Sequence, residues 1–348
     1  MRRVWFLAGA LGLASSAAAA ETFVFAAVER GTFRADGSHE LGSEAEYVVG
    51  RGAQGEMRAV LVFDLDTLRA PVTSALLRVW SPADGVESPD AGERVGAYGV
   101  SSDPQRLVWE PSVDSVLALE PALGTFWDLG TGRRLGVGQV RAGEVGFVEI
   151  PLDSAWLRVL NRSDGLVALG LAVDSLRKPP FDSAPVRELA FENSGAGVPH
   201  AELVLETDAT VDPGGPLTLH VDARARRHGR GSEADPFRTL AGAIDLATAG
   251  DDVEVAPGRY AETLIMKRDV DVRGSGADRT IIDIGAGLPS MRCADASLDS
   301  IYVNGDPRAS QVVDCTNGTS PTLANVELPT IFLENSRAIV RNSETGSI

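Results

Sequence analysis

The sequence predicts an all-β protein, in which a jelly-roll-like β-sandwich is followed by a short parallel β-helix capped by an amphipathic helix. Residues 21–207 hold short β-branched and aromatic segments separated by Gly, Pro, Asp and Ser, with little helical periodicity. Residues 252–284 hold still shorter alternating segments, each followed by a glycine-containing turn. Because these turns are too short to bring distant strands together, they favour a coil of stacked parallel strands.

The chain begins with the pattern of a secretory signal peptide over residues 1–20. Arg2 and Arg3 precede an apolar run, and a stretch of small residues ends at Ala20. The run is too short to span a bilayer, and no later stretch is long and apolar enough to do so. We therefore expect a protein that is secreted, extracellular or periplasmic, with no membrane span after cleavage of the signal.

The amino-acid composition limits the kinds of binding partner that are expected. The chain has 348 residues and a formal net charge of −17, which argues against nucleic acid because such a partner requires a basic surface. Lys178 and Lys267 are the only lysines beside many arginines, which suggests a bacterial source. The length predicts two domains. Nothing in the sequence indicates the oligomeric state.

The first domain is expected to be the β-sandwich, residues 21–207. Its strand-like segments are FVFAAV (23–28), RAVLVFDL (58–65), SALLRVWS (74–81), RVGAYGV (94–100), GFVEIPL (146–152), LVALGLAV (166–173) and AELVLET (201–207). Several short strands spaced by turn residues predict two packed sheets of jelly-roll type. One helical interruption is expected after residue 151, where Asp153 or Ser154 caps a turn that carries Trp156 inward.

The order of these segments resembles a family of secreted domains. RAVLVFDLDTLRAPVTSALLRVWS, then GFVEIPLDSAWLRVLNRSDGLVALGLAV, then AELVLET is similar to the bacterial β-sandwiches related to DNRLRE-type and carbohydrate-binding-module domains. The resemblance covers most of residues 21–207. It implies the sandwich fold and a glycan ligand.

A linker over residues 208–216 and a capping helix over about 236–249 are expected next. The linker lies within TDATVDPGGPL, which has two prolines and paired glycines between strand-like segments. In the helix, one apolar stripe consists of Leu240, Ala243, Ile244 and Ala247. Thr239 or Asp235 can cap its start and Gly250 suits its end.

Residues 217–348 are expected to form the short β-helix. HVDA, GSEADPFRTLAGAIDLATAGDDVEVAPGRYAE and VDVRGSGADRTIID resemble the opening of a pectin-lyase-like right-handed parallel β-helix. That family has a first strand, a Pro-Phe-x-Thr-Leu helix, a Gly-Asp-x-Val strand, a Pro-Gly-x-Tyr turn and a Gly-x-Gly corner. The helix is expected to cover the open backbone edge and apolar core at the end of the coil.

The two cysteines lie 22 residues apart in segments that can be aligned as neighbouring coils. Setting CADASLDSIYV (293–303) over CTNGTSPTLAN (315–325) pairs Cys293 with Cys315, Leu298 with Ser320 and Ile301 with Leu323. Adjacent coils lie about 4.8 Å apart, which is within the Cα range of a disulfide. We expect the two cysteines to stack, either as a disulfide or as buried free thiols.

Two groups of charged residues are candidate ligand sites. Asp64 and Asp66 lie two apart at the end of a strand and, with loop oxygens, suit Ca²⁺; the alternative is a pair of exposed turn acids. No other cofactor is expected. Near residue 227, a basic run can bind an anion or a glycan, the alternative being a solvated loop. Its arginines are Arg224, Arg226, Arg227 and Arg230.

The function expected from these features is that of an exported, non-catalytic protein that binds a polysaccharide or cell-surface glycan, or has a structural or adhesive role. The alternative is a lyase or hydrolase of acidic glycans, as the β-helix resemblance implies. Candidate outward-facing acids for such an enzyme are Asp271, Asp283, Asp295, Asp306 and Asp314, with Arg273. Because no pair of them matches a catalytic spacing, no residue is assigned a catalytic role.

Overall fold

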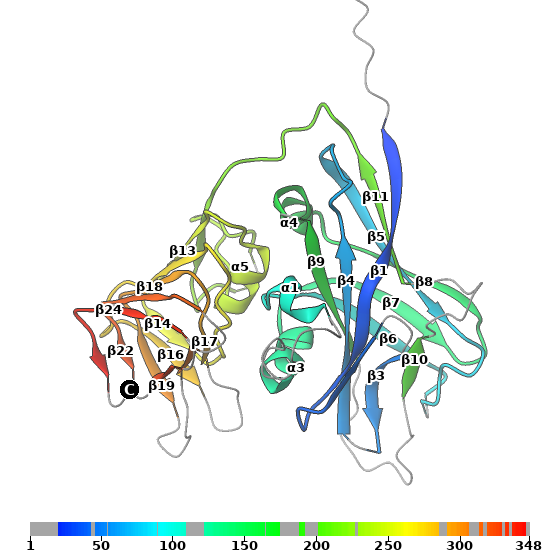
Figure 1. Ribbon diagram of the computed structural model, residues 1–348, viewed down its shortest axis with the longest axis horizontal. Coiled ribbons are helices and arrows are strands. Elements are labelled where there is room, and N and C mark those ends of the chain that lie inside the picture. Colours follow the sequence, from blue (N-terminus) through cyan, green and yellow to red (C-terminus); the bar gives the residue numbers. More distant parts are fainter. Residues whose placement is uncertain are drawn as a thin grey trace, which may run out of the picture.

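The protein is described by a computed structural model with two β-rich halves that lie side by side (Figure 1). The described residues are 20–42, 46–53, 55–88, 90–108, 122–163, 165–174, 188–191, 201–226, 229–284, 291–305, 313–315, 319–328, 331–333 and 336–345. The predicted signal peptide lies outside them except for its last residue. The predicted all-β class is confirmed, because strands dominate both halves.

The first half is an antiparallel sandwich whose two layers share one long strand. β1 (Glu21–Arg34) pairs with β11 (Glu202–Thr207) over its first part and with β4 (Gly55–Asp64) over its second, with a register shift between Ala27 and Glu29. The strand order is β7-β6-β9-β4-β1-β11-β5-β8. Their bounds are β5 Val72–Ser81, β6 Gly92–Gly99, β7 Arg134–Arg141, β8 Gly146–Pro151 and β9 Leu166–Val173, and the short strands β2 His39–Leu41, β3 Tyr47–Gly52 and β10 Leu189–Phe191 pair alongside.

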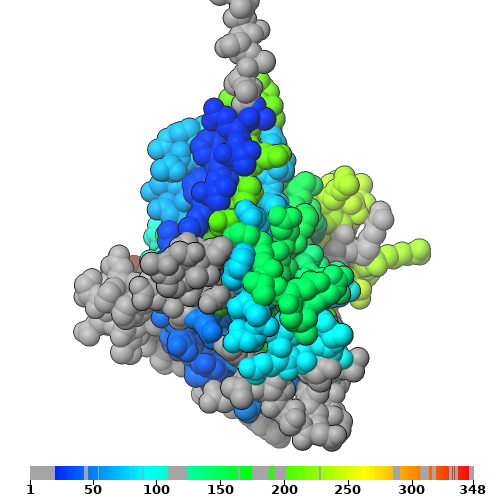
Figure 2. Space-filling model, turned by 90° about the vertical axis from the view of Figure 1, so that its right-hand side faces the viewer, coloured from blue at the N-terminus to red at the C-terminus, as the bar shows by residue number. Residues whose placement is uncertain are grey.

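Alternation along the strands builds the core of the sandwich. Leu203 and Leu205 of β11 face the same hydrophobic cluster as Leu61 and Phe63 of β4, and all four are fully buried. Figure 2 views the molecule from the sandwich side and shows β1 in dark blue beside β11 in green at the surface. The first part of β1 therefore has an outer face exposed to solvent, where Val24 is 56% exposed.

Short helices gather on the side of the sandwich that faces the second half (Figure 1). The expected interruption after residue 151 is present as the 3-10 turn η1 (Ser154–Trp156) and α4 (Leu157–Arg162), capped by Asp153, whose carboxylate accepts a hydrogen bond from Ala155 N at 2.9 Å. Two further helices, α1 (Pro104–Leu107) and α3 (Ala122–Thr131), were not predicted from the sequence.

The second half is a parallel β-helix with three sheets. Successive coils add one strand to each sheet, in the orders β12-β13-β15-β18-β21-β24, β14-β16-β19-β22-β25 and β17-β20-β23. The strands are β12 Thr218–Val221, β13 Asp252–Val255, β14 Gly258–Tyr260, β15 Asp271–Arg273, β16 Thr280–Ile284, β17 Met291–Arg292, β18 Ser297–Asp299, β19 Tyr302–Gly305, β20 Val313–Cys315, β21 Thr322–Ala324, β22 Glu327–Leu328, β23 Ile331–Leu333, β24 Ile339–Arg341 and β25 Glu344–Thr345. Inward residues stack from coil to coil, as Val253, Val272, Leu298 and Leu323 do.

The capping helix is shorter than the predicted range 236–249. α5 spans Leu240–Leu246, because Thr239 has an extended backbone and caps the helix by accepting a hydrogen bond from Gly242 N at 3.2 Å. Phe237 precedes it as a bridge partner of Val221, with its N–H bonded to His220 O. The residues before Thr239 therefore extend the sheet rather than the helix.

The cysteines stack as predicted and are bridged, with 4.8 Å between their Cα atoms. The alignment of the following residues was wrong, because Leu298 lies over Leu323 rather than over Ser320, and Ile301 does not lie over Leu323. The offset grows from 22 to 25 because the corner after Cys315 is three residues longer than the corner after Cys293. An inward leucine requires an apolar neighbour above it, and the longer corner restores that register.

The two halves are joined by a segment without strands, from Thr207, where β11 ends, to Thr218, where β12 begins; it arches over the top of Figure 1. The division into domains at residues 207 and 217 stays a prediction. Among the residues that the structure describes, none of the helices has the length and apolar character to cross a membrane.

Candidate site at the junction of the two halves

The acidic pair predicted to bind calcium closes a turn. Asp64 ends β4 and Asp66 follows it, both exposed, and Asp64 Oδ1 accepts a hydrogen bond from Asp66 N at 2.9 Å. Within the described residues, no group of three or more His, Cys, Asp or Glu side chains is arranged to hold a metal ion. Calcium binding at this pair stays a prediction.

The basic run lies on an exposed loop. Arg224 forms an ion pair with Asp222, with 3.1 Å between Nε and Oδ1, and 74% of its side chain is exposed. Arg226 and Arg230 are also exposed, whereas Arg227 lies outside the described residues. The role of the run in anion binding stays a prediction.

The acids on the lateral faces of the β-helix bond to neighbouring coils. Asp271 Oδ1 accepts a hydrogen bond from Ser297 N at 3.0 Å, and Asp295 Oδ1 accepts one from Ser320 N at 2.6 Å. Asp283 accepts two from Arg259 at 2.8 and 2.9 Å and one from Asn304 at 2.7 Å.

The other charged residues that were predicted to face outward from the β-helix do not form a further cluster with these acids. Arg273 lies 3.9 Å from Asp299 on the next coil, Asp314 lies beside Arg292, and Asp306 lies outside the described residues. The lateral acids thus act as links between coils.

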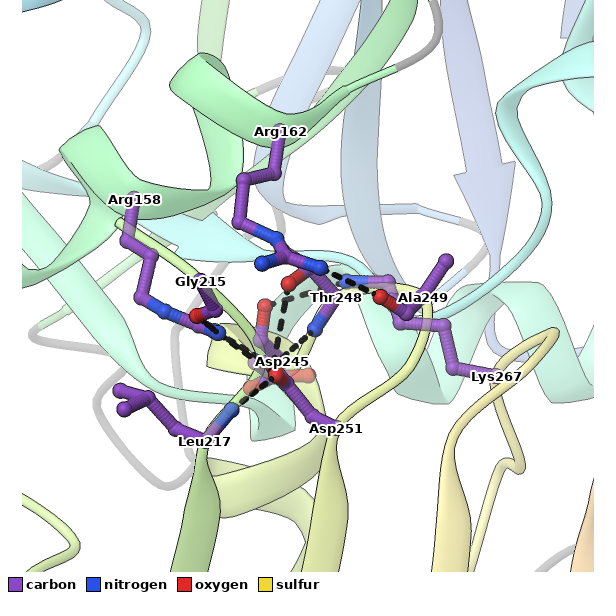
Figure 3. A network of polar contacts seen from close by, with 9 residues as sticks. All are labelled: Arg158, Arg162, Gly215, Leu217, Asp245, Thr248, Ala249, Asp251 and Lys267. Atoms are coloured by element: carbon purple, nitrogen blue, oxygen red, sulfur yellow. Dashed lines mark hydrogen bonds and ion pairs between the residues drawn. The ribbon is translucent and has the colours of Figure 1, made fainter. Parts of the chain in front are cut away.

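A buried polar network joins the two halves (Figure 3). Arg158 of α4 forms a bidentate ion pair with Asp251, which follows α5, and one of its two hydrogen bonds is 2.6 Å. Asp251 also accepts hydrogen bonds from Leu217 N and Thr248 N, both at 2.8 Å. Burial raises the pKa of Asp251, but these hydrogen bonds outweigh burial, so that its pKa lies below its ordinary range.

A second buried cluster lies beside the first. Asp245 of α5 accepts hydrogen bonds from the Ser101 hydroxyl at 2.8 Å and from Arg133 N, both in the sandwich. Lys267 approaches from the β-helix and donates to Asp245 O at 3.3 Å. Burial raises the pKa of Asp245 to about 7, and the nearby Asp128 carboxylate adds to this shift. Burial also lowers the pKa of Lys267, although Asp245 and Asp128 partly compensate.

A partly open cavity of about 200 Å³ lies next to this network, between the two halves. The sandwich lines it with apolar side chains from α4 and β9, which include Val159, Leu166 and Val167, and with the charged residues Asp103, Arg106 and Arg162. The β-helix contributes the apolar Ile265 and Met266 beside charged residues such as Lys267 and Arg292. We call this cavity the junction pocket.

The junction pocket is more basic than the chain as a whole. Among the lining residues that the structure describes, five are basic and three are acidic, although the chain carries a net charge of −17. The bases are Arg106, Arg162, Lys267, Arg268 and Arg292, and the acids are Asp103, Asp269 and Asp295. Arg268 is paired with Asp103 at 2.9 Å, and Arg292 lies beside Asp314.

This site was not predicted from the sequence. Arg158 and Arg162 are four residues apart and so share one face of α4, a spacing that was readable from the sequence. Asp245 lies next to the apolar stripe of α5, and a charged residue there is expected to face solvent. It is only 1% exposed, because that side of the helix packs against the sandwich. The pocket forms where the surfaces of the two halves meet.

Comparisons with known proteins complete the description of the chain. A family model described as "Protein of unknown function (DUF1565)" matches residues 226–274, which include α5 and the first coil. No curated protein matches the chain.

The chain matches several solved structures at low TM-scores. The catalytic domain of a GH87 alpha-1,3-glucanase in complex with tetrasaccharides has a TM-score of 0.27 and 11% identity, and the match covers 92% of this chain and 54% of that one. The Agl-KA catalytic domain has a TM-score of 0.25 and 10% identity, with 94% and 62% covered. The catalytic unit of a GH87 alpha-1,3-glucanase from Streptomyces thermodiastaticus strain HF3-3 has a TM-score of 0.20 and 12% identity, with 91% and 58% covered. The chain thus spans less than two thirds of the length of each of these domains. The likeness of its first half to carbohydrate-binding modules stays a prediction.

Proposed function

We propose that the protein is an exported, non-catalytic glycan-binding protein and that the junction pocket holds one saccharide unit of its ligand. The observation that carries the proposal is the mixed lining of the pocket. A sugar ring has an apolar C–H face and a polar edge of hydroxyl groups, and the pocket offers apolar side chains beside hydrogen-bonding ones.

The size of the junction pocket supports a ligand of this kind. A cavity of about 200 Å³ has room for roughly a dozen or more water positions, and roughly a dozen is also the number of non-hydrogen atoms in a hexose. Placement at the interface of two folded units is typical of ligand sites in proteins.

Export is supported by the chain's own chemistry. The Cys293–Cys315 disulfide is a bond that persists in oxidising compartments, in agreement with the signal-like start of the sequence. The hydrogen bonds of the lateral acids to neighbouring coils give these carboxylates a structural role, which supports a non-catalytic assignment.

Calorimetric titration of the whole mature chain with a set of mono- and disaccharides tests the proposal, using Ala294→Phe as the variant and Ala296→Phe as its matched control. Both alanines are half-buried against the same core, but only Ala294 lines the junction pocket. We expect the first variant to abolish saccharide binding and the second to leave it unchanged.

Equal loss in both variants, or saccharide binding that survives filling of the pocket, overturns the assignment of the site. Release of reducing ends or of unsaturated products during the titration overturns the non-catalytic assignment. A parallel titration in EDTA tests the predicted calcium site at Asp64 and Asp66, since chelation has no expected effect on the junction pocket.

A further inference from the structure

Two buried carboxylates from opposite halves of the protein meet at one serine. Asp128 belongs to α3 of the sandwich and Asp245 to α5, which caps the β-helix, and they are 4% and 1% exposed. Asp128 accepts hydrogen bonds from Ser101 N at 3.0 Å and from Ser102 N at 2.7 Å. The Ser101 hydroxyl donates to Asp245 Oδ1 at 2.8 Å. The two acids therefore share one neighbour at the junction of the halves.

The surface of the sandwich is shaped to receive Asp245. A Cβ atom at Gly99 would lie 2.9 Å from Asp245 Cβ, and one at Gly132 would overlap Asp245 Oδ2. Arg133 N donates a hydrogen bond to Asp245 Oδ2 across the junction. Because these glycines leave room for the Asp245 side chain, the two surfaces come together around it.

The charges that face the two acids do not balance when both are ionised. Lys267 reaches the cluster from the β-helix and acts on both carboxylates (Figure 3). The Arg133 guanidinium group is directed to Asp153 instead, at 2.7 Å. Asp251 and Arg158 also act on Lys267, but their charges pair with each other. One ammonium group does not neutralise two buried carboxylates, so a proton bound between them removes the excess negative charge.

Burial favours this proton while the halves are in contact. It raises the pKa of Asp245 to about 7, with a further contribution from Asp128, and it raises the pKa of Asp128 against the hydrogen bonds from Ser101 and Ser102. When the halves separate, water reaches both carboxylates and their pKa values return towards about 4. The closed junction therefore binds more protons than the open one between about pH 4 and 7, and its stability must fall as the pH rises through this range.

We propose that the contact between the two halves is a proton-dependent switch, closed while Asp128 and Asp245 share one proton and loosened when that proton is lost. The Arg158–Asp251 ion pair is the fixed part of the contact. The pKa of Asp251 lies below its ordinary range, so its carboxylate stays ionised above about pH 4. The junction pocket lies between the same two halves, so loosening of the contact should widen it.

Hydrogen exchange of the whole mature chain, measured in steps from pH 5 to pH 8, tests the switch. Division of the intrinsic exchange rate at each pH by the observed rate gives a protection factor. The Arg133 amide reports on the junction, because its hydrogen bond to Asp245 crosses between the halves. The strands β4 and β9 in the core of the sandwich are the internal reference for global unfolding.

We expect the protection factor at Arg133 to fall roughly ten- to a hundredfold from pH 5 to pH 8, with a much smaller change in β4 and β9. Asp245→Asn is expected to remove most of this fall, since the amide does not titrate. Lys267→Met is expected to move the midpoint of the fall to higher pH, because loss of the ammonium group makes ionisation of both acids less favourable. Arg158→Met is the matched control, and it should lower the protection by the same factor at pH 5 and pH 8.

The results separate a switch at the junction from a general effect of pH on the protein. Protection at Arg133 that does not change with pH, or an equal fall in β4 and β9, overturns the switch. A fall that persists in full in Asp245→Asn overturns the assignment to the shared proton. If Asp245→Asn does not fold, Lys267→Met decides alone, and a midpoint that stays in place or moves to lower pH overturns the inference. None of these measurements involves a glycan, so failure of the switch leaves the proposed function standing.

Discussion

Replacing Arg158 by methionine should weaken the contact between the two halves. The stability lost should be larger than the loss that follows removal of an exposed ion pair. Methionine retains most of the apolar stem of the side chain but removes the bidentate pair with Asp251. The side chain of Asp251 is fully buried, and that of Arg158 is 18% exposed. Removing one partner of a buried pair costs about 3–5 kcal/mol, because the remaining charge stays buried.

The expected loss of unfolding free energy is smaller in Arg158→Met, because other groups also donate hydrogen bonds to Asp251. Leu217 N and the N–H and hydroxyl groups of Thr248 still bond to its carboxylate in the variant. We therefore expect a decrease of about 2–3 kcal/mol in the free energy of unfolding at neutral pH. For folded units of this size, that corresponds to a melting temperature roughly 5–10 °C lower.

The loss should depend on pH in a defined direction. The pKa of Asp251 is lower in the folded protein than in the unfolded chain, so its contribution to stability is present above its ordinary pKa and is lost as the pH falls through the folded value. The difference between wild type and Arg158→Met should therefore be full at neutral pH and should shrink below about pH 4.

Urea unfolding followed by tryptophan fluorescence, at neutral pH and at about pH 3, measures this difference. Arg141→Met is the matched control, since Arg141 pairs with Glu144 at 3.3 Å with more than half of each side chain exposed, and such a pair contributes about 0–1 kcal/mol. Equal losses in the two variants, or a loss in Arg158→Met that persists in full at pH 3, would refute the reasoning.

Three further predictions follow from single contacts. Glu262→Ala should destabilise α5 by about 1–2 kcal/mol, because the Glu262 carboxylate accepts hydrogen bonds from Leu240 N and Ala241 N at 2.9 Å each. Hydrogen exchange of the α5 amides should become faster in this variant, and by more than in Glu262→Gln. Asp245 has a raised pKa in the folded protein, so its contribution to stability falls as the pH rises from its ordinary value towards 7; Asp245→Asn should flatten this part of the pH profile in urea unfolding. Replacing both cysteines by serine should lower the unfolding free energy by roughly 3 kcal/mol for a loop of this length, and non-reduced peptide mapping should recover the bridged pair from the wild type.

The repeated coils of the β-helix were predictable because the alternation of apolar and polar residues along each short strand determines which side chains face inward. Val253 and Val272 alternate with polar neighbours, and an alternating strand beside a tight corner can stack only with its apolar side inward. The register of Leu298 was not predictable from the cysteine spacing, because a corner can change length without changing the strands that it joins. Corners lie outside the apolar core and tolerate insertions.

The candidate site was harder to predict because its residues come from separate surfaces. Arg106 and Arg292 are 186 positions apart, and each alone has the pattern of an ordinary charged residue near an apolar segment. Periodicity reports which side chains face the core of their own element, and it carries no information on which polar faces meet. The sequence feature that came closest to indicating the site was the four-residue spacing of Arg158 and Arg162 in α4.

Because the junction pocket has one wall from each half, ligand binding and the stability of the junction must be linked. A ligand that binds only when the halves are in contact stabilises that contact by about 2.7 kcal/mol at a concentration one hundred times its dissociation constant. This is close to the expected cost of Arg158→Met, so a saturating ligand should restore much of the lost melting temperature. A ligand held by one half alone also stabilises the folded protein, but it binds equally well whether or not the halves are in contact, so its affinity is the same for Arg158→Met and Arg141→Met. Weaker binding of the tightest-binding sugar to Arg158→Met than to Arg141→Met therefore indicates that both halves contact the ligand.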